Sequence, residues 1–170
     1  MSATGRTIPL VVIVEGKNHI ESWYRDRLHQ KELILLSESG FITNPLALRY
    51  LEHFIKHTDA GPNKPLKLLL IDNYSSHISP EFIDLATRHN IVLFSFPAHL
   101  THCMQPCDVG IFQSYKHWHS KAIQYALETL DFKYTVASFL RDLPEVRLRT
   151  FKKTTIPSAF QKCRMWPIDP

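Results

Sequence analysis

Glycine, cysteine and long hydrophobic runs are all scarce in this 170-residue sequence. Its five glycines form neither GxGxxG nor GxxxxGK[ST], which excludes the glycine-rich loops that bind nucleotide phosphates. Uncharged runs such as Leu68–Ile71 and Ile91–Pro97 are far shorter than the roughly 18 residues that a membrane span needs, so we expect no membrane partner. The sequence has three cysteines, an odd number, and its N-terminus lacks the small-residue cleavage site of a secretory signal peptide. Both features favour free thiols in a reducing compartment.

The remaining composition is typical of a globular chain. Hydrophobic residues make up 44% of the sequence and charged residues 21%, values that argue against disorder. The length is close to the roughly 150 residues of an average domain. We therefore expect one domain over residues 1–170.

Positive charge is in excess only in residues 141–170, which we call the basic segment. This segment holds seven of the 20 Lys and Arg residues but only three of the 16 Asp and Glu residues. The positive and negative charges of residues 1–140 are therefore equal in number, and the basic segment carries the whole net charge of +4. Such a segment can bind the phosphate backbone of nucleic acid, although a solvated lysine-rich surface is the alternative interpretation.

Strand and helix patterns alternate along the chain. Strands are predicted at residues 8–14, 33–36, 66–71 and 91–96, and helices at residues 44–57, 80–89, 108–130 and 134–140, with mixed structure after the last helix. Residues 97–107 are predicted to be an irregular loop. In the second helix we expect Phe82, Ile83, Leu85 and Ala86 to face inward. In the third, the apolar residues near helical spacing, which are expected to form its buried face, are Val109, Phe112, Tyr115, Trp118, Ile123 and Leu127. The alternation predicts an α/β fold with a section of parallel sheet.

Two aspartates are the candidate ligands of a divalent cation. Asp72 directly follows the strand at 66–71, and ligand sites of α/β sheets lie at the carboxyl ends of strands. Asp108 opens the long helix. The helix, strand and loop between them can return the chain beside its starting strand, so both carboxylates could face one Mg²⁺ ion. Capping of a turn by Asp72 and of a helix by Asp108 are the structural alternatives.

Other groups of reactive side chains match known sites less well. His99, His102, Cys103 and Cys107 are zinc-ligand types, but their crowded spacing matches no zinc finger or ribbon. A G-x-S-x-G turn, the mark of a serine hydrolase, does not surround Ser75 and Ser76. A thiol nucleophile would also need an oxyanion hole, for which the sequence has no signal.

The segments around the two aspartates resemble the DDE superfamily endonucleases of pogo-type transposases, the group with relatives of jerky and centromere-binding protein B. The matching segments are LLLIDNYSSH (68–77), FSFPAHLTHCMQPCDVGIFQSYK (94–116) and the closing IPSAFQKCRMWPIDP (156–170). Arg164 stands where this group usually has glycine. The resemblance extends from about Ser2 to Pro170.

The resemblance implies a ribonuclease-H-like α/β fold, with a mixed sheet flanked by helices, and metal-dependent cleavage and transfer of DNA strands in the nucleus. Asp72 and Asp108 would be the second and third catalytic carboxylates and would bind Mg²⁺ or Mn²⁺. The residues that would orient these carboxylates or contact DNA are His77, His99, His102, Gln105 and Lys116.

The same resemblance implies a first catalytic aspartate on a first central strand, just before Glu-x-Gly. Here no aspartate precedes Asp26, and residues 2–6 match the turn between the second and third strands. We therefore expect a core without its first central strand, which binds the ion weakly and has little activity. A decayed or domesticated fragment that only binds DNA or a partner, and an unrelated α/β phosphohydrolase, remain alternatives, and self-association into a homo-oligomer is left open.

Overall fold

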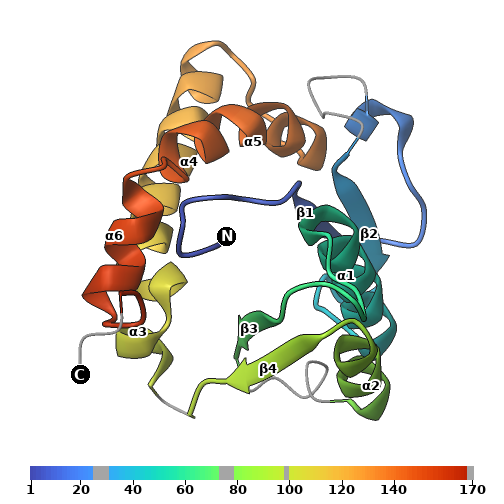
Figure 1. Ribbon diagram of the computed structural model, residues 1–170. Helices are drawn as coiled ribbons and strands as arrows, with labels where there is room; N and C mark the ends of the chain where they lie inside the picture. The colour runs from blue at the N-terminus through green and yellow to red at the C-terminus, as the bar shows by residue number, and fades with distance from the viewer. Residues whose placement is uncertain (25–30, 73–78, 98–99, 168–170) are drawn as a thin grey trace. The chain divides into compact units, whose positions relative to one another are not determined.

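The computed structural model describes residues 1–24, 31–72, 79–97 and 100–167, and the chain forms two compact units (Figure 1). The sheet unit consists of Ile8–Asn18 and Lys31–Thr101. The helical unit consists of Met1–Thr7, His19–Gln30 and His102–Pro170. All of the described strands belong to the sheet unit.

The described strands form two separate pairs. They are β1 (Val11–Glu15), β2 (Leu33–Ser37), β3 (Lys67–Ile71) and β4 (Ile91–Ser95). β1 pairs with β2 and β3 pairs with β4, both in parallel, and within the described ranges no strand joins the two pairs. The predicted α/β class and the return of the chain beside β3 are confirmed. The described strands do not form the predicted single mixed sheet, because hydrogen bonds join them only into two separate pairs.

Two helices complete the sheet unit, and both begin as their sequences predict. They are α1 (Asn44–Thr58) and α2 (Pro80–Arg88), each with proline in its first turn. The Phe82 N–H donates a hydrogen bond of 3.3 Å to Ser79 Oγ, which caps α2. Thr43 precedes α1 in the same extended conformation, but its side chain makes no cap hydrogen bond.

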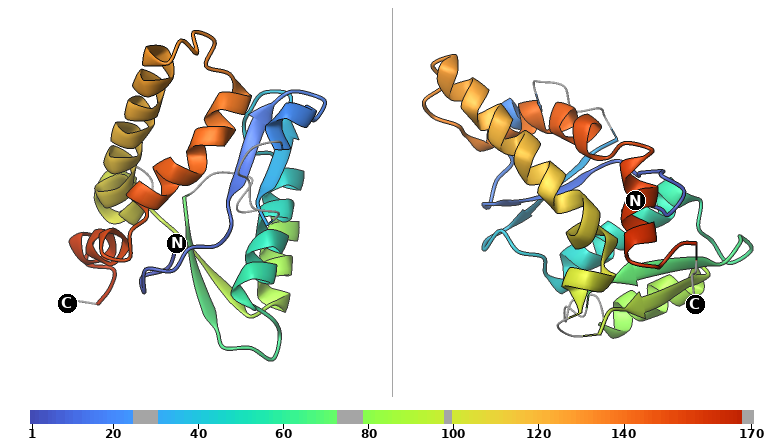
Figure 2. Two further views of the ribbon diagram at one scale, coloured as in Figure 1. Left: turned by 90° about the horizontal axis from the view of Figure 1, so that it is seen from above. Right: turned by 90° about the vertical axis from the view of Figure 1, so that its left-hand side faces the viewer.

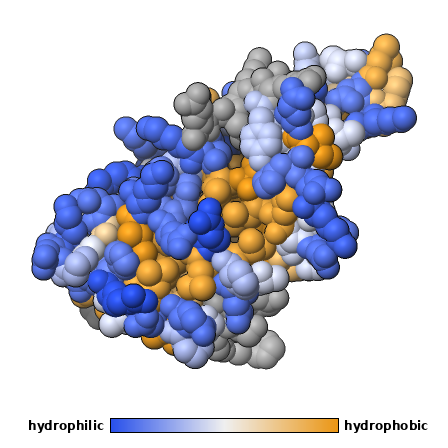
Figure 3. All heavy atoms as spheres, turned by 90° about the vertical axis from the view of Figure 1, so that its right-hand side faces the viewer, coloured by the Kyte–Doolittle hydropathy of each residue, from blue (hydrophilic) through white to orange (hydrophobic). Residues whose placement is uncertain are grey.

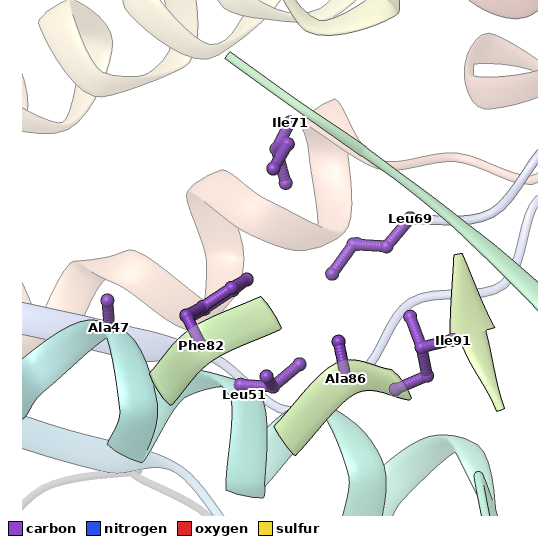
Figure 4. Close-up of a cluster of buried hydrophobic side chains, with 7 residues drawn as sticks. All are labelled: Ala47, Leu51, Leu69, Ile71, Phe82, Ala86 and Ile91. Carbon is purple, nitrogen blue, oxygen red and sulfur yellow. The ribbon is translucent and has the colours of Figure 1, made fainter. Parts of the chain in front are cut away.

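The core of the sheet unit lies between these helices and the β3–β4 pair (Figure 4). Its buried side chains are Ala47, Leu51, Leu69, Ile71, Phe82, Ala86 and Ile91. Each large apolar side chain buried in this way stabilises the fold by about 1.5–3 kcal/mol. Phe82 and Ala86 face inward as predicted, but Ile83 is 46% exposed and that expectation was wrong. Successive helical residues are about 100° apart, so the position after Phe82 lies beyond the narrow face that contacts the strands.

The helical unit contains the rest of the described elements. They are η1 (Glu21–Tyr24), α3 (Thr101–Met104, which starts at the last residue of the sheet unit), η3 (Cys107–Ile111), α4 (Phe112–Glu128), α5 (Val136–Thr150) and α6 (Thr155–Lys162). The helices α4 and α5 pack along one another (Figure 2). The ring of His119 lies between those of Tyr115 and Phe139, with centroids 5.9 and 5.4 Å away. η1 packs against α5 and buries Trp23.

Three expectations for the helical unit were wrong in detail. Residues 97–107 are not an irregular loop throughout, because α3 forms within them. The long helix begins at Phe112 rather than at Asp108, since η3 is a turn of π-helix. A π-turn adds a residue to the helical repeat and rotates the side chains that follow. Ile111 is accordingly buried whereas Phe112 is 43% exposed; Leu127, in the last turn of α4, is 48% exposed.

Hydrophobic side chains also reach the surface of the molecule. Figure 3 shows one face on which they gather among hydrophilic ones. In the sheet unit, Leu68 of β3 and Phe94 of β4 are 61% and 42% exposed. The β3–β4 pair therefore buries apolar side chains on one face and leaves others exposed.

Candidate metal and nucleic-acid site

Asp72 lies where the sequence predicts it, at the carboxyl end of a parallel strand. It directly follows β3 and is half-buried. At this end Ile71 is opposite Ser95, and the Phe96 N–H donates a 3.0 Å hydrogen bond to the Ile71 carbonyl. The hydrogen bonds between β3 and β4 therefore continue to Ile71, the residue before Asp72. They fix the backbone that carries the Asp72 carboxylate.

Asp108 lies in the π-turn η3 and is exposed. The backbone N–H groups of Asp108 and Val109 both donate to the Gln105 carbonyl, at 3.0 and 3.1 Å. The Phe112 N–H closes the turn on the Cys107 carbonyl. Asp108 is thus not the cap of a regular helix, which was the structural alternative, because Pro106 occupies the capping position of η3. π-turns are rare and are frequently found at functional sites.

Close packing against α6 supports the turn that carries Asp108. Gly110 of η3 meets Ala159 of α6 so directly that a Cβ on Gly110 would lie 2.9 Å from the Ala159 Cα. Real Cβ contacts are essentially never below 3.0 Å, so only glycine fits this position without a shift. Sequence reasoning missed this residue, although an isolated glycine in a helical pattern is a signal of close packing.

The three cysteines gather in the part of the helical unit around Asp108. Burial raises the pKa of the Cys107 thiol. Burial also raises the pKa of the Cys163 thiol, and the neighbouring Cys103, Cys107 and Asp108 raise it further. All three side chains carry thiols rather than disulfides. No local pattern could have predicted that Cys163 lies near Asp108, because 54 residues separate them in sequence.

Arg164 follows α6 in the left-handed conformation, with φ of 55°. Its N–H donates to the Gln161 carbonyl at 2.9 Å, and the Met165 N–H donates to the Phe160 carbonyl at 3.0 Å. These bonds close the helix in the way that glycine-terminated helices end. The geometry gives a physical reason for the glycine that is usual here in the transposases that the sequence resembles.

Of the seven cations of the basic segment, two form ion pairs and four are exposed without an ion pair among the described residues. The seventh, Arg147, lies over the Phe151 ring with its guanidinium carbon 5.7 Å from the ring centre. Arg141 hydrogen bonds to Asp142 at 2.8 Å, and Arg149 lies 2.6 Å from a Glu145 oxygen and 4.7 Å from the centre of the Trp118 ring. The exposed cations, which form no ion pair with the described part of the chain, are Lys152, Lys153, Lys162 and Arg164. These four side chains are the ones in the basic segment that are best placed to bind phosphate groups.

The structure places three of the five supporting residues named in the sequence analysis. His102 is exposed in α3, Gln105 is half-buried between α3 and η3, and Lys116 is exposed on α4. Gln105 is joined to Asp108 through its backbone carbonyl. His77 and His99 lie outside the described residues, so their roles stay predictions.

The type of donor at the two aspartates suits a hard cation. Carboxylate oxygens are the ligands that Mg²⁺ and Mn²⁺ prefer, and both side chains are at least partly exposed. Asp72 belongs to the sheet unit and Asp108 to the helical unit, so their binding of one shared ion stays a prediction. Among the residues that the structure describes, no three His, Cys, Asp or Glu side chains are grouped as ligands of one ion.

These elements define an α/β protein with carboxylates at a strand end and in a helical turn, and with exposed cations. Compared with known families, residues 1–160 match the family described as DDE superfamily endonuclease. The chain belongs to this family. The match confirms the resemblance first noted around Asp72 and Asp108, whereas membership of the narrower pogo-type group stays a prediction.

A curated relative is 30% identical to this chain over 170 residues, which is the whole chain. It is the protein named MFS-type transporter clz9 from Cochliobolus lunatus, and the chain spans 18% of its length. The name describes that much longer protein. In the described ranges of this chain, no helix combines the length and the apolar character needed to cross a membrane. No solved structure matches the chain significantly.

Proposed function

We propose that this chain is a DNA-binding domain of ribonuclease-H-like fold, derived from the catalytic core of a nuclear transposase that cleaves and transfers DNA strands with Mg²⁺ or Mn²⁺. Family membership supports the class of reaction. The observation that supports the site most directly lies within the helical unit. The turn η3, which carries Asp108, packs against α6, and the exposed cations Lys162 and Arg164 lie at the end of α6 and just after it.

Cations on a helix that packs against the turn of Asp108 suit a phosphodiester substrate. Lys162 and Arg164 would attract the DNA backbone and hold a phosphate near Asp108. Asp72 and Asp108 would hold the metal ion through their oxygens, and a bound ion supplies charge neutralisation at phosphate and an activated water or 3′-hydroxyl. The Gln105 carbonyl keeps the Asp108 backbone in its π-turn. Lys116, exposed on α4, would add a contact to phosphate.

Plasmid nicking tests the catalytic proposal. The full chain is incubated with supercoiled plasmid and Mn²⁺. We expect at most weak nicking, which should be lost in both Asp72→Asn and Asp108→Asn. The matched control is Asp59→Asn, which removes an exposed carboxylate paired with Lys64 and should leave nicking unchanged. Nicking that survives in both test variants would come from another nuclease and would contradict the assignment of these residues.

A non-enzymatic DNA-binding protein is the second candidate. The four exposed cations of the basic segment favour it, because phosphate binding through them needs no carboxylate. Filter retention of DNA measured against salt concentration tests this function. We expect the salt dependence to weaken by about one unit of slope for each of these cations that is neutralised. Retention without nicking, unaffected by Asp72→Asn and Asp108→Asn, would favour binding alone.

A further inference from the structure

β4 has an edge that no strand of the described residues covers. Its other edge pairs with β3, where the Phe96 N–H bonds to the Ile71 carbonyl just past the strand end. Backbone groups of alternate residues in a parallel strand point to opposite sides. The N–H and C=O groups of Ile91 and Leu93 are therefore directed away from β3, and we call this side the outer edge of β4.

A groove of about 470 Å³ is lined by α2 and β4 and extends to Ile71 of β3. Ile83 and Thr87 line it from α2, and they are one helical turn apart and so share a side of the helix. Ile91 and Leu93 line it from β4. Ile91 and Leu93 therefore contribute both the outward-directed backbone groups and part of the apolar lining of the groove.

The outer edge lacks the charged residues and prolines that often keep exposed strands apart. Its sequence, IVLFS, contains no charged residue and no proline, although natural proteins usually protect edge strands with such residues or with bulges. The exposed apolar side chains on and next to the β3–β4 pair are Leu66, Leu68, Ile83, Val92 and Phe94. Leu68, Val92 and Phe94 alternate with core-facing residues, so they lie on the other face of the strand pair from Ile83, and only part of this exposed area lies at the outer edge.

We propose that two copies of this chain associate through the outer edge of β4. The two β4 strands run antiparallel about a two-fold axis and extend the sheet from one copy into the other. Leu93 is the middle residue of β4, so pairing centred on it joins the outward backbone groups of both strands. Ile83 of each copy enters the groove of the other. This proposal does not depend on the proposed binding of DNA.

The charges beside the groove fit a second copy better than an unrelated apolar peptide. Asp84 and Arg88 form an ion pair on α2, next to Ile83 and Thr87. A two-fold axis through Leu93 brings the two α2 helices antiparallel on one face of the joined sheet. Asp84 of one copy then faces Arg88 of the other, twice, as an interface between identical surfaces requires.

Sedimentation equilibrium of the full chain tests the proposal. We expect a dimer at micromolar concentrations, with a dissociation constant that Ile83→Asp raises by at least about tenfold, because the new carboxylate is buried without a partner. The matched control is Leu127→Asp, the same change at a helical position of similar exposure, 48% against 46%. A chain that stays monomeric, including one that binds an added apolar peptide instead, or a dimer indifferent to Ile83→Asp, overturns the proposal.

Charge reversal separates association from folding. Asp84→Arg and Arg88→Asp should each weaken self-association, because each places like charges opposite one another in a symmetric pair. An equimolar mixture of the two variants should associate again, since every contact between them joins opposite charges. If both variants fold, as circular dichroism reports, and their mixture stays monomeric, the antiparallel contact between the α2 helices is wrong.

Hydrogen exchange of the unmodified chain gives a test that needs no variant. The amides of Ile91 and Leu93 should become protected as protein concentration rises. Those of Val92 and Phe94 are directed toward β3 and should be protected at every concentration. Exchange at Ile91 and Leu93 that does not depend on concentration overturns the proposed edge pairing.

Discussion

Gly110 of η3 and Ala159 of α6 touch so closely that a methyl group on Gly110 would lie 2.5 Å from the Ala159 Cβ. Ala159 is 1% exposed, so it has no free space into which to move. The π-turn that carries Asp108 is therefore set in place by a helix more than forty residues later in the chain. The packing of α6 and the position of the candidate carboxylate are linked through this contact.

Gly110→Ala should destabilise the protein by about 1–3 kcal/mol, the usual cost of overpacking a well-packed contact. Adding Ala159→Gly should recover part of the loss, because it removes the Cβ that clashes most. Recovery should be incomplete, since the Ala159 Cα would still lie 2.9 Å from the new methyl group. Urea unfolding of the two single variants and the double variant measures this coupling.

Gly61→Ala is the matched control for that change. The nearest atom to a Cβ at Gly61 is the flexible Lys64 Cγ at 3.4 Å. Its effect on the free energy of unfolding should stay within about 0.5 kcal/mol, because the Lys64 side chain can move aside. Equal losses at Gly61 and Gly110 would mean that the contact with Ala159 is not the cause.

Arg164→Gly should stabilise the fold and weaken DNA binding at the same time. Glycine adopts the left-handed conformation of this position without strain, which we expect to add about 1 kcal/mol to the free energy of unfolding. Loss of the cation should reduce the salt dependence of DNA retention by about one unit of slope. Thermal unfolding and filter binding measure the two effects separately.

Arg164→Ala distinguishes the two contributions. It removes the charge but keeps a Cβ in the left-handed conformation, so DNA retention should fall without a gain in stability. If Arg164→Gly and Arg164→Ala had the same stability, the backbone conformation at the end of α6 would not be the source of the strain.

The helical unit should lose stability at alkaline pH through Tyr134. Burial raises the pKa of its phenol, and the charge of Asp142 raises it further. Because the folded state holds this proton more tightly, the stabilisation is complete below the unfolded-state pKa of about 10. It is lost as the pH rises from there through the pKa of the folded state. The free energy of unfolding, measured by urea between neutral and strongly alkaline pH, should therefore fall less steeply in Tyr134→Phe.

Tyr125→Phe provides the comparison for the alkaline measurement. Tyr125 is 67% exposed, so Tyr125→Phe makes the same chemical change at an exposed position of the helical unit. A steep alkaline loss that persists in Tyr134→Phe would assign the effect to other groups, such as the Tyr115 phenol, whose pKa burial also raises.

Ser79→Ala should cost about 1 kcal/mol because it removes the hydrogen bond from the Phe82 N–H that caps α2. Thr43→Ala at the start of α1 is the natural comparison, since the Thr43 side chain makes no such bond. Thr43→Ala should therefore cost clearly less. Urea unfolding of the two variants decides, and equal costs would show that the Ser79 bond contributes nothing in solution.

Helix and strand positions in the sheet unit could be predicted from the sequence because their signals are local. Proline after Asn44 and after Ser79 marks two helix starts, and apolar runs with β-branched residues mark the strands. The predicted strand at 8–14 begins only at Val11, which is the usual uncertainty of element ends. Ile83 was misplaced because helical periodicity does not reveal how wide the buried face is.

The candidate site could be predicted only in part. Asp72 is at the predicted strand end, because an aspartate after a buried apolar run has a local signature. The π-turn around Asp108 has no such signature, since it depends on packing against α6. Cys163 near Asp108 and the left-handed Arg164 likewise depend on how the end of the chain folds back.

The sequence by itself determined the α/β class, the family and the two aspartates, because periodicity, capping residues and motif spacing are properties of neighbouring residues. Only the tertiary structure decided that Gly110 fits against Ala159 and that, among the described residues, no strand covers the apolar outer edge of β4. Those features arise from contacts between residues far apart in the chain. Their free energies depend on packing and burial, which no short stretch of sequence contains.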